Sequence, residues 1–299
     1  MKKLLDFLAH LISKMSYSKI EKIGSILGFF IGNILLYRRK ETKNTIAKAL
    51  PDIDKKEINK ILNGMYKNLG KIVLESAGIE RINKKFIETY IEFDGLQKVF
   101  EIMNEKKGAI AITAHIGNFE ILGPIASTLG VPITVIVKYI KPKLLHEWWV
   151  ESRAKFGIQF IPPKHSYHLC LQALERKRMV VFVLDQNMRR HRGIFVDFFS
   201  QPACTSPGPA ILSAQTGRPV IPIFIARLMN GKHKIFIKDP IPPVKNMTKE
   251  KIREATQIYT KVIEDFIRLF PDQWIWLHRR WRTKPLEKTI QYHTTDTTN

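Results

Sequence analysis

The stretch "AIAITAHIGNFEILG", residues 109–123, decides how the rest of the chain is interpreted. An apolar run typical of a buried strand ends at His115, and a carboxylate, Glu120, follows five residues later. Side chains five residues apart do not stack on one regular helix, where neighbours are three or four apart. The spacing instead fits a strand, a turn through Gly117 and a helix with Asn118 as its predicted N-cap. We therefore expect His115 at the carboxyl end of a strand, facing a cleft.

A histidine in that place has a chemical use. A carboxylate hydrogen-bonded to one imidazole nitrogen fixes the tautomer, and the other nitrogen can then take a proton from a hydroxyl. Glu120 is the candidate for that carboxylate, while Gly117 and the free amides at the helix start can approach a substrate closely. The alternative is a satisfied histidine at a strand end, with Glu120 as a favourable charge near a helix N-terminus.

The chain changes character near residue 88, where a helical pattern gives way to segments rich in Val, Ile and Phe. These segments predict strands at 90–95, 109–114, 132–138, 179–185, 193–199, 219–226 and 233–239. Helical patterns lie between most of them, at 118–129, 142–156, 166–177, 208–217 and 248–270. The alternation predicts an α/β fold with a mixed, mostly parallel central sheet flanked by helices, which binds ligands at the carboxyl edge of its strands. We divide the chain into a helical region (1–88), an α/β domain (89–285) and a flexible tail (286–299).

The helical region contains an uncharged run of fifteen residues from Ile23 to Tyr37. It is shorter than the roughly 20 residues that a helix needs to span hydrocarbon, and no cleavage site typical of a signal peptide follows it. Basic residues flank it on both sides, which is typical of a helix lying in the cytoplasmic face of a membrane. We predict a membrane-associating helix over 20–37, with a buried core helix as the alternative.

The charge balance is the most unusual feature of the composition. In 299 residues, 49 Lys and Arg stand against 27 Asp and Glu, a formal net charge of +22. That excess favours anionic partners: nucleic acid, acidic proteins or anionic lipid. The two cysteines, Cys170 and Cys204, are too few for a disulfide framework, and no Cys/His spacing predicts a metal site. We expect no metal and a reducing, cytosol-facing location.

Four ordered blocks carry a resemblance to a known family. "HIGNFEILG" (115–123) resembles the His-x4-Asp/Glu motif of glycerolipid acyltransferases, and looks closest to the late acyltransferases of lipid A biosynthesis, the lauroyl and myristoyl transferases. Their block typically reads His-Phe-Gly-Asn-Trp-Glu. "DQNMRRHRGIFVDFF", "ACTSPGPAILSAQTGRPVIPIF" and "DQWIWLHRRWRTKP" match later family blocks in the expected order. The resemblance covers roughly residues 1–285.

The resemblance implies transfer of a fatty acyl chain from an acyl carrier protein thioester, or from acyl-CoA, to a hydroxyl of an anionic lipid A precursor. It implies that His115 is the base and Glu120 its orienting carboxylate, with no cofactor. It places the enzyme at the cytoplasmic face of the inner membrane, as a peripheral protein or with one N-terminal anchor. The substrate-binding residues expected are Arg153, Asp185, Gly117, Asn118 and Arg189. Because no Gly-x-Ser-x-Gly elbow occurs in the sequence, we expect direct transfer without an acyl-enzyme.

Several of these residues keep an alternative. Arg153 is favoured as a ligand for phosphate or for the thioester carbonyl, with a surface arginine on an amphipathic helix as the alternative. Asp185 ends a buried strand, which favours a site near His115, but a strand-ending turn residue also fits. Cys204 is not favoured as a nucleophile, because no neighbour in the sequence would lower its pKa.

Two segments are expected to face anionic partners. Between residues 138 and 192, twelve Lys or Arg stand against four acids, and "RRHR", beginning at Arg189, directly follows the predicted strand that ends at Asp185. A phosphorylated glycolipid and an acidic carrier protein would both favour that field, and a solvated basic face is the alternative. "WIWLHRRWR" (274–282) is typical of a membrane headgroup region, or else of core tryptophans with arginines reaching outward.

Two other functions stay open from the sequence. A nucleic-acid-binding protein would explain the net charge of +22 and the interleaved aromatics, but the chain contains no nucleic-acid-binding motif and has a long apolar N-terminal segment. An acyltransferase with a different acceptor, such as a phosphatidylinositol mannoside or another lysolipid, would keep the fold and change only the substrate.

Overall fold

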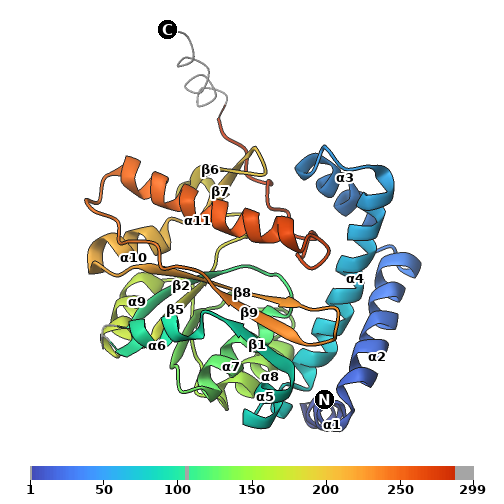
Figure 1. Ribbon diagram of the computed structural model, residues 1–299. Helices are drawn as coiled ribbons and strands as arrows, with labels where there is room; N and C mark the ends of the chain where they lie inside the picture. The colour runs from blue at the N-terminus through green and yellow to red at the C-terminus, as the bar shows by residue number, and fades with distance from the viewer. Residues whose placement is uncertain (1, 105–107, 287–299) are drawn as a thin grey trace.

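The computed structural model describes residues 2–104 and 108–286, which form a layered α/β structure around one large sheet (Figure 1). The sheet has seven strands in the order β1-β9-β8-β2-β5-β3-β4, and every neighbouring pair is parallel except β8 with β9. These strands are β1 (Ile91–Asp94), β2 (Ala109–Thr113), β3 (Ile133–Ile136), β4 (Gln159–Ile161), β5 (Met179–Val183), β8 (Val220–Arg227) and β9 (His233–Ile237). The predicted mixed, mostly parallel sheet is confirmed.

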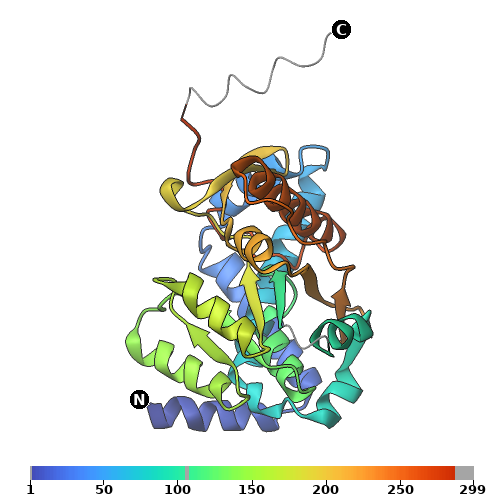
Figure 2. The ribbon, with the colours of Figure 1, turned by 90° about the vertical axis from the view of Figure 1, so that its left-hand side faces the viewer.

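Helices cover both faces of this sheet, as Figure 1 and the side view in Figure 2 show. One face carries α5 (Lys84–Tyr90), α6 (Leu96–Asn104) and α7 (Leu122–Thr128), whose apolar residues share a hydrophobic cluster with the sheet. The opposite face carries α9 (Ser166–Glu175), α10 (Gly208–Thr216) and α11 (Lys249–Leu269), which share a second cluster with it. α8 (Lys143–Ala154) precedes the edge strand β4.

β2 shows why its sequence reads as a continuous apolar run. All five of its residues are buried. Ile110 and Ile112 belong to the cluster beneath α9, α10 and α11, whereas Ala109 and Ala111 belong to the cluster beneath α5, α6 and α7. Successive side chains of a strand point to opposite faces, so a strand covered on both sides must be apolar at every position.

The predicted strands and helices of the α/β part all appear, within a few residues at their ends. One strand is placed differently: the predicted 193–199 is β6 (Ile194–Phe198), which pairs with β7 (Gln201–Thr205) in a separate antiparallel hairpin. The sequence analysis missed β7 and β4. β4 has only three residues, too few to form a pattern, and β7 reads Gln-Pro-Ala-Cys-Thr, which contains no Val, Ile or Phe.

The N-terminal region consists of helices, as predicted: α1 (Lys2–Lys14), α2 (Tyr17–Phe29), a π-helical turn (Phe30–Ile34), α3 (Arg39–Ala49) and α4 (Lys55–Ala77). Buried side chains of α3 and α4, such as Ile46 and Leu62, belong to the same cluster as Ile112 of the central sheet. The helices therefore share a core with the α/β part, and the boundary at residue 88 stays a prediction. Beyond Leu286, the predicted tail lies outside the described residues.

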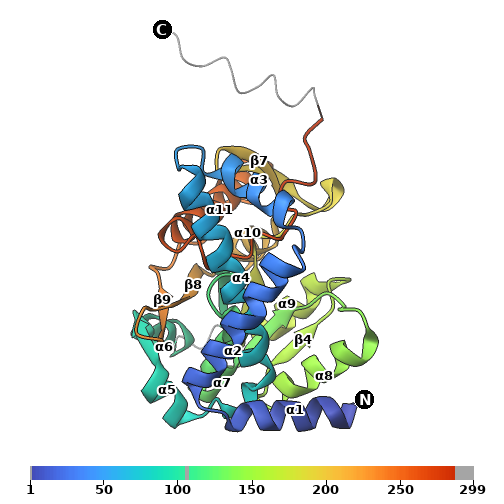
Figure 3. The same ribbon diagram turned by 90° about the vertical axis from the view of Figure 1, so that its right-hand side faces the viewer.

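α2 runs along α4 (Figure 3). A stripe of three glycines spaced by four residues, Gly24, Gly28 and Gly32, lets the two backbones come into contact. A Cβ on Gly28 would lie 2.0 Å from the carbonyl oxygen of Tyr66, and one on Gly70 would lie 2.1 Å from that of Gly24. Gly32 packs in the same way against the ring of Tyr66. With this stripe turned toward α4, many of the large apolar side chains of the run are exposed: Ile23, Ile26, Phe29, Phe30, Ile34, Leu35, Leu36 and Tyr37.

The predicted membrane-associating segment, 20–37, is thus a helix packed on one side and apolar on the other. Within residues 2–104 and 108–286, no individual helix has the length and apolar content to cross a membrane. Tyr17–Ile34 and Arg39–Ala49, bent by 96° to each other, meet that test as a pair, by length and composition only.

Replacing Gly28 by Ala is expected to lower the free energy of unfolding by about 1–3 kcal/mol, the usual cost of overpacking. The added methyl group would collide with backbone atoms of α4, which cannot move independently of the helix. Chemical denaturation followed by circular dichroism measures the change. Lys22→Ala, at an exposed position of the same helix, is the control and should stay within about 0.5 kcal/mol. An unchanged Gly28→Ala protein would show that α2 and α4 are not in backbone contact.

Candidate active site

His115 lies two residues beyond β2, at the carboxyl edge of the sheet, and is paired with an acid from the next strand. Its Nδ1 is 2.7 Å from Oδ1 of Asp185, and its backbone N–H donates to Oδ2 of Asp185 at 2.9 Å. The register explains this pairing, because Thr113 lies opposite Val183 in the parallel pair β2–β5. Two residues further along each strand, His115 and Asp185 therefore face each other on the same side.

The pairing determines which imidazole nitrogen is available. Asp185 is buried and also accepts a hydrogen bond from the indole N–H of Trp274 at 2.7 Å, so its carboxylate is held from two sides. With that carboxylate accepting at Nδ1, the imidazole carries its proton there and Nε2 is left as the acceptor. Nε2 lies 3.2 Å from the side-chain amide nitrogen of Gln186, and the His115 side chain is 15% exposed.

The charges around the imidazole favour its protonated form. Burial lowers the pKa of His115, but the charge and hydrogen bond of Asp185, aided by the charge of Glu120, outweigh burial and raise it above its ordinary value. Burial raises the pKa of Asp185, yet His115, His278 and Trp274 together outweigh burial and lower it well below its ordinary value, so the carboxyl group stays ionised. A base arranged in this way is stabilised once it has taken a proton.

Glu120 does not occupy the place predicted for it. Its Oε2 accepts hydrogen bonds from Arg153 (2.6 Å from Nη2 and 3.0 Å from Nε) and from the indole of Trp149 (2.9 Å). The predicted hydrogen bond between Glu120 and the imidazole is therefore wrong, because Asp185 already occupies Nδ1. The helix start is a 3-10 turn, Phe119–Ile121, and Glu120 on that turn pairs with residues of α8.

Arg153 is 1% exposed, so the surface alternative for this residue is wrong. Besides the ion pair with Glu120, its guanidinium contacts the hydroxyls of Ser76 (3.0 Å) and Ser152 (2.9 Å) and lies 4.4 Å from the ring centroid of Trp149. Burial lowers the pKa of Arg153, and Glu120 opposes that effect. The charge of Arg153 is matched inside the protein, so it is poorly suited to binding a phosphate.

Gly117 and Asn118, predicted to bind substrate, instead make packing contacts inside the protein. Gly117 has a φ of +59°, and a Cβ there would lie 2.1 Å from the carbonyl oxygen of Ile225, so the glycine permits close packing on β8. Its N–H donates to the carbonyl of Gln273 at 3.2 Å and is not free for a substrate. Asn118 is fully buried, and its side chain makes no capping hydrogen bond. Its side-chain N–H donates a hydrogen bond to the carboxylate of Glu75. Both residues hold the turn in place.

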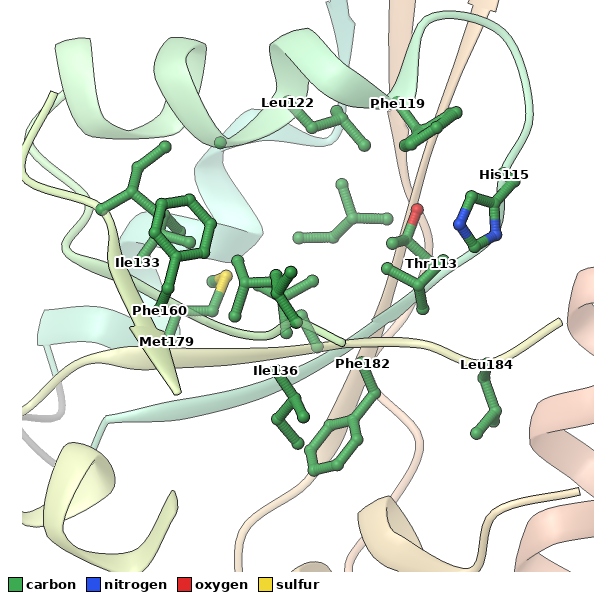
Figure 4. A pocket seen from close by; sticks show the side chains of 18 of the residues that line it. Thr113, His115, Phe119, Leu122, Ile133, Ile136, Phe160, Met179, Phe182 and Leu184 are labelled. Carbon is green, nitrogen blue, oxygen red and sulfur yellow. The ribbon is translucent and has the colours of Figure 1, made fainter. Parts of the chain in front are cut away.

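A cavity of about 1090 Å³ opens beside His115 (Figure 4). Its lining is mostly aliphatic and aromatic, and it includes Glu120, Arg153 and Gln186 near the imidazole. The volume lies slightly above the roughly 300–1,000 Å³ usual for small-molecule sites. Within the part of the chain that the structure describes, no group of three or more His, Cys, Asp or Glu side chains could hold a metal ion.

Arg189, predicted to bind substrate, lines this cavity and is exposed, as is Arg192 three residues later. Neither side chain has an ion-pair partner among residues 2–104 and 108–286. The two guanidinium groups are thus free to meet an anion.

The structure decides between the two interpretations of the segment 274–282: the tryptophans belong to the core, as the alternative predicted, but Arg280 does not reach outward. Trp274 and Trp276 are fully buried, and so is Arg280, which donates to the carbonyl of Cys204 at 2.9 Å and to the hydroxyl of Thr205. The membrane-headgroup interpretation is wrong for these three residues. Cys204 is itself buried and its pKa is raised by burial, so it is unsuited to act as a nucleophile.

Three neighbours of His115 were missed from the sequence: Trp274, Gln186 and His278. The ring of His278 lies 4.6 Å from that of His115, centroid to centroid. Burial, followed by the positive charge of His115, lowers the pKa of His278 to about 4, so it stays neutral beside an imidazolium. In the sequence, Gln186 could have been found because it directly follows Asp185. Trp274 and His278 could have been found because they lie in the aromatic-rich segment 274–282.

Comparison with known proteins bears on the identity of this site. A sequence model of the family described as bacterial lipid A biosynthesis acyltransferase matches residues 4–283. The chain belongs to this family of acyltransferases. The family resemblance inferred from the four sequence blocks is confirmed.

The relatives are distant in sequence, and the lipid A acyltransferases among them cover more than nine tenths of the chain. A lipid A biosynthesis acyltransferase of Haemophilus influenzae is 22% identical over 93% of this chain and 86% of its own. The lipid A biosynthesis lauroyltransferase of Escherichia coli is 21% identical, over 92% and 89%. A phosphatidylinositol mannoside acyltransferase of Mycobacterium tuberculosis is 23% identical over 58% and 54%. The solved 1-acyl-sn-glycerophosphate acyltransferase of Thermotoga maritima covers 83% of this chain and 97% of its own, with 13% identity and a TM-score of 0.39.

Replacing Asp185 by Asn is expected to move the acid limb of the pH–activity profile to lower pH. The carboxylate raises the pKa of His115, so its removal lets burial lower that pKa, and the base loses its proton at a more acidic pH. The pH dependence of kcat/KM, which reports the free enzyme, measures the shift. Turnover should fall at every pH because the tautomer is no longer fixed. Asp197→Asn, at an exposed position, is the control. An unmoved limb in Asp185→Asn would contradict the pairing.

Proposed function

We propose that the protein transfers a fatty acyl chain from a thioester, carried by an acyl carrier protein or coenzyme A, to a hydroxyl group of a lipid A precursor. The reaction would take place at the cytoplasmic face of the inner membrane. The observation that carries the proposal is the His115–Asp185 pair, which turns Nε2 of the imidazole, bonded to the exposed amide of Gln186, toward a large apolar cavity. Membership of an acyltransferase family supports the reaction class.

The reaction needs one base and no covalent intermediate. Nε2 of His115 takes the proton of the acceptor hydroxyl as that oxygen attacks the thioester carbonyl carbon. The carbon–sulfur bond then breaks, and the imidazolium returns the proton to the departing thiolate. Asp185 orients the imidazole and stabilises its charged form between the two proton transfers. Both cysteines are buried, which agrees with a direct transfer.

The pair of Glu120 and Arg153 has a supporting role in this proposal. Its ion pair ties the turn after β2 to α8 and so holds one wall of the cavity next to the imidazole. The charge of Glu120 also helps to raise the pKa of His115, although no hydrogen bond joins the two side chains. We therefore assign Glu120 and Arg153 to positioning and not to proton transfer.

The membrane surface is proposed as the place of the reaction because of the N-terminal helices. α1 exposes Leu4, Phe7, Leu8 and Leu11, and α2 with the π-helical turn exposes Ile26, Phe29 and Phe30, among others. Exposed apolar patches of this kind mark interaction sites. An amphipathic helix with basic flanks binds anionic membranes through its buried apolar area and its charge.

A second acceptor class is favoured by one observation. More than half of the chain is similar in sequence to a phosphatidylinositol mannoside acyltransferase, an enzyme named for a different glycolipid. The reaction and the roles of His115 and Asp185 would be unchanged. A mixture of the two acceptors in one assay separates these possibilities directly.

Replacing His115 by Ala is expected to reduce turnover by about 10²–10⁴-fold, the usual contribution of a positioned base. The assay incubates purified protein with acyl carrier proteins of several chain lengths and a lipid A precursor, and the products are identified by mass. His168→Ala, an exposed histidine on α9, is the control and should retain full turnover. Near-normal turnover in the His115→Ala protein would remove this residue from the mechanism.

Membrane binding is tested with vesicles that contain an anionic phospholipid. The double variant Ile26→Asp, Phe29→Asp should bind at least tenfold more weakly, since burying each side chain is worth about 1.5–3 kcal/mol. Co-sedimentation measures the binding. Ile258→Asp, which alters an exposed apolar residue of α11, is the matched control. Equal binding by the two variant proteins would show that α2 does not contact the membrane.

A further inference from the structure

The cavity beside His115 extends over both faces of the central sheet. Thr113, Phe119 and Leu122 line it on the side of α7, and Ile136, Phe182 and Leu184 line it on the other side of the strands (Figure 4). The hydrophobic clusters agree with the picture, because Phe182 and Leu184 belong to the cluster beneath α10 while Leu122 packs against the cluster beneath α7. A pocket confined to one face would be lined by every second residue of a strand.

The pairing of the strands explains how one cavity reaches both faces. β3 and β5 are paired only as far as Val135 opposite Val181. β5 continues along β2 to Val183, and β3 continues along β4 to Ile136, so the two strands diverge beyond that point. Just beyond the last β3–β5 pair, consecutive residues line the cavity. They are Ile136 and Val137 after Val135, and Phe182 and Val183 after Val181. The sheet is parted there, toward its carboxyl edge.

The cavity therefore has two apolar arms that meet at the carboxyl edge. We call them the α7 arm and the α10 arm. The α7 arm is lined by Leu122, Ala126, Val131, Ile133, Met179 and Ile235. The α10 arm is lined by Ile136, Tyr167, Cys170, Phe182, Ile211 and Leu212.

The two arms differ in charge. Arg153 lies on the side of the α7 arm, and its charge is matched by Glu120. Arg189 and Arg192 also line the cavity. The segment that carries them packs on β7, since the backbone N–H of Met188 donates to the carbonyl of Cys204 at 3.0 Å. This contact places both arginines on the side of the α10 arm. β7 leads directly into α10. Among the described residues, these two guanidinium groups have no ion-pair partner, so this arm has free positive charge at its mouth.

We propose that the α10 arm binds a hydrocarbon chain already present on the anionic acceptor, with Arg189 and Arg192 at a phosphate of its headgroup, while the α7 arm holds the chain being transferred. This inference rests on the proposed function. A donor and an acceptor that are both lipids need two apolar sites, and the reacting hydroxyl must lie between them beside His115. An acceptor chain buried in its own arm would bring the hydroxyl to the junction of the arms and exclude water there.

Two matched variants separate the arms. Ile211→Trp narrows the α10 arm and is expected to raise the KM for the acylated acceptor by about tenfold or more, with the preferred length of the donor chain unchanged. Ala126→Phe narrows the α7 arm and should shift the donor preference to shorter chains, with the acceptor KM unchanged. The double variant Arg189→Gln, Arg192→Gln should raise the KM for a phosphorylated acceptor. The KM for a dephosphorylated acceptor should stay unchanged. A shift of donor length in Ile211→Trp, or no change in its acceptor KM, would overturn the inference.

A binding experiment distinguishes failure of this inference from failure of the proposed function. An anionic lipid A precursor with a photoreactive group near the end of one acyl chain is incubated with the wild-type protein without donor and irradiated. Labelled peptides are expected from α9 and α10. Labelling of α7 and β9 instead would overturn the assignment of the arms, even if transfer is observed. Labelling of α9 and α10 without any transfer would leave the acceptor site standing and reject the proposed reaction.

Discussion

The contact between His115 and Asp185 is the interaction on which the site depends, and it is produced by strand register. Because β2 and β5 are parallel and paired in step, the residues two beyond the last pair meet on one side of the sheet. A shift by one residue would turn one of the two side chains to the opposite face. The geometry of the pair is therefore fixed by the same hydrogen bonds that build the sheet, and the apolar residues that bury β2 and β5 also hold the imidazole and the carboxylate together.

The turn that follows β2 is supported from behind by a buried polar network. Asn118 donates to Glu75 of α4, and Glu75 is bound by Arg227 of β8 at 2.8 and 2.9 Å. Burial raises the pKa of Glu75, but the charge and hydrogen bonds of Arg227, together with His233 and Tyr17, outweigh burial and lower that pKa to about 2. Tyr17 of α2 also donates to Glu75, at 2.7 Å. The N-terminal helices and the turn at His115 are thus joined through a largely buried ion pair, and removing one partner would leave the other charge poorly hydrated.

Much of the fold could be read from the sequence because each strand of the sheet carries its own local signal. Runs of Val, Ile and Phe located the long strands, and Gly117 and the polar residues around it located the turn. The local signal failed where an element is short or is formed by pairing alone, as in β4 and β7. At 274–282 the local signal left a headgroup surface and core tryptophans equally open, and the structure buries Trp274 against Asp185 and Arg280 against a backbone carbonyl.

By itself, the sequence determined that a histidine stands at the end of a buried strand, that an acid follows it within one turn, and that the chain resembles an acyltransferase family. These are properties of neighbouring residues and of ordered blocks. Only the tertiary structure decided which acid holds the imidazole, because Asp185 is seventy residues from His115 and reaches it through the pairing of β2 with β5. It also decided the shape of the cavity, since the parting of β3 from β5 depends on which neighbour each strand follows. Contacts between distant segments are set by packing and register, and no local pattern of side chains encodes them.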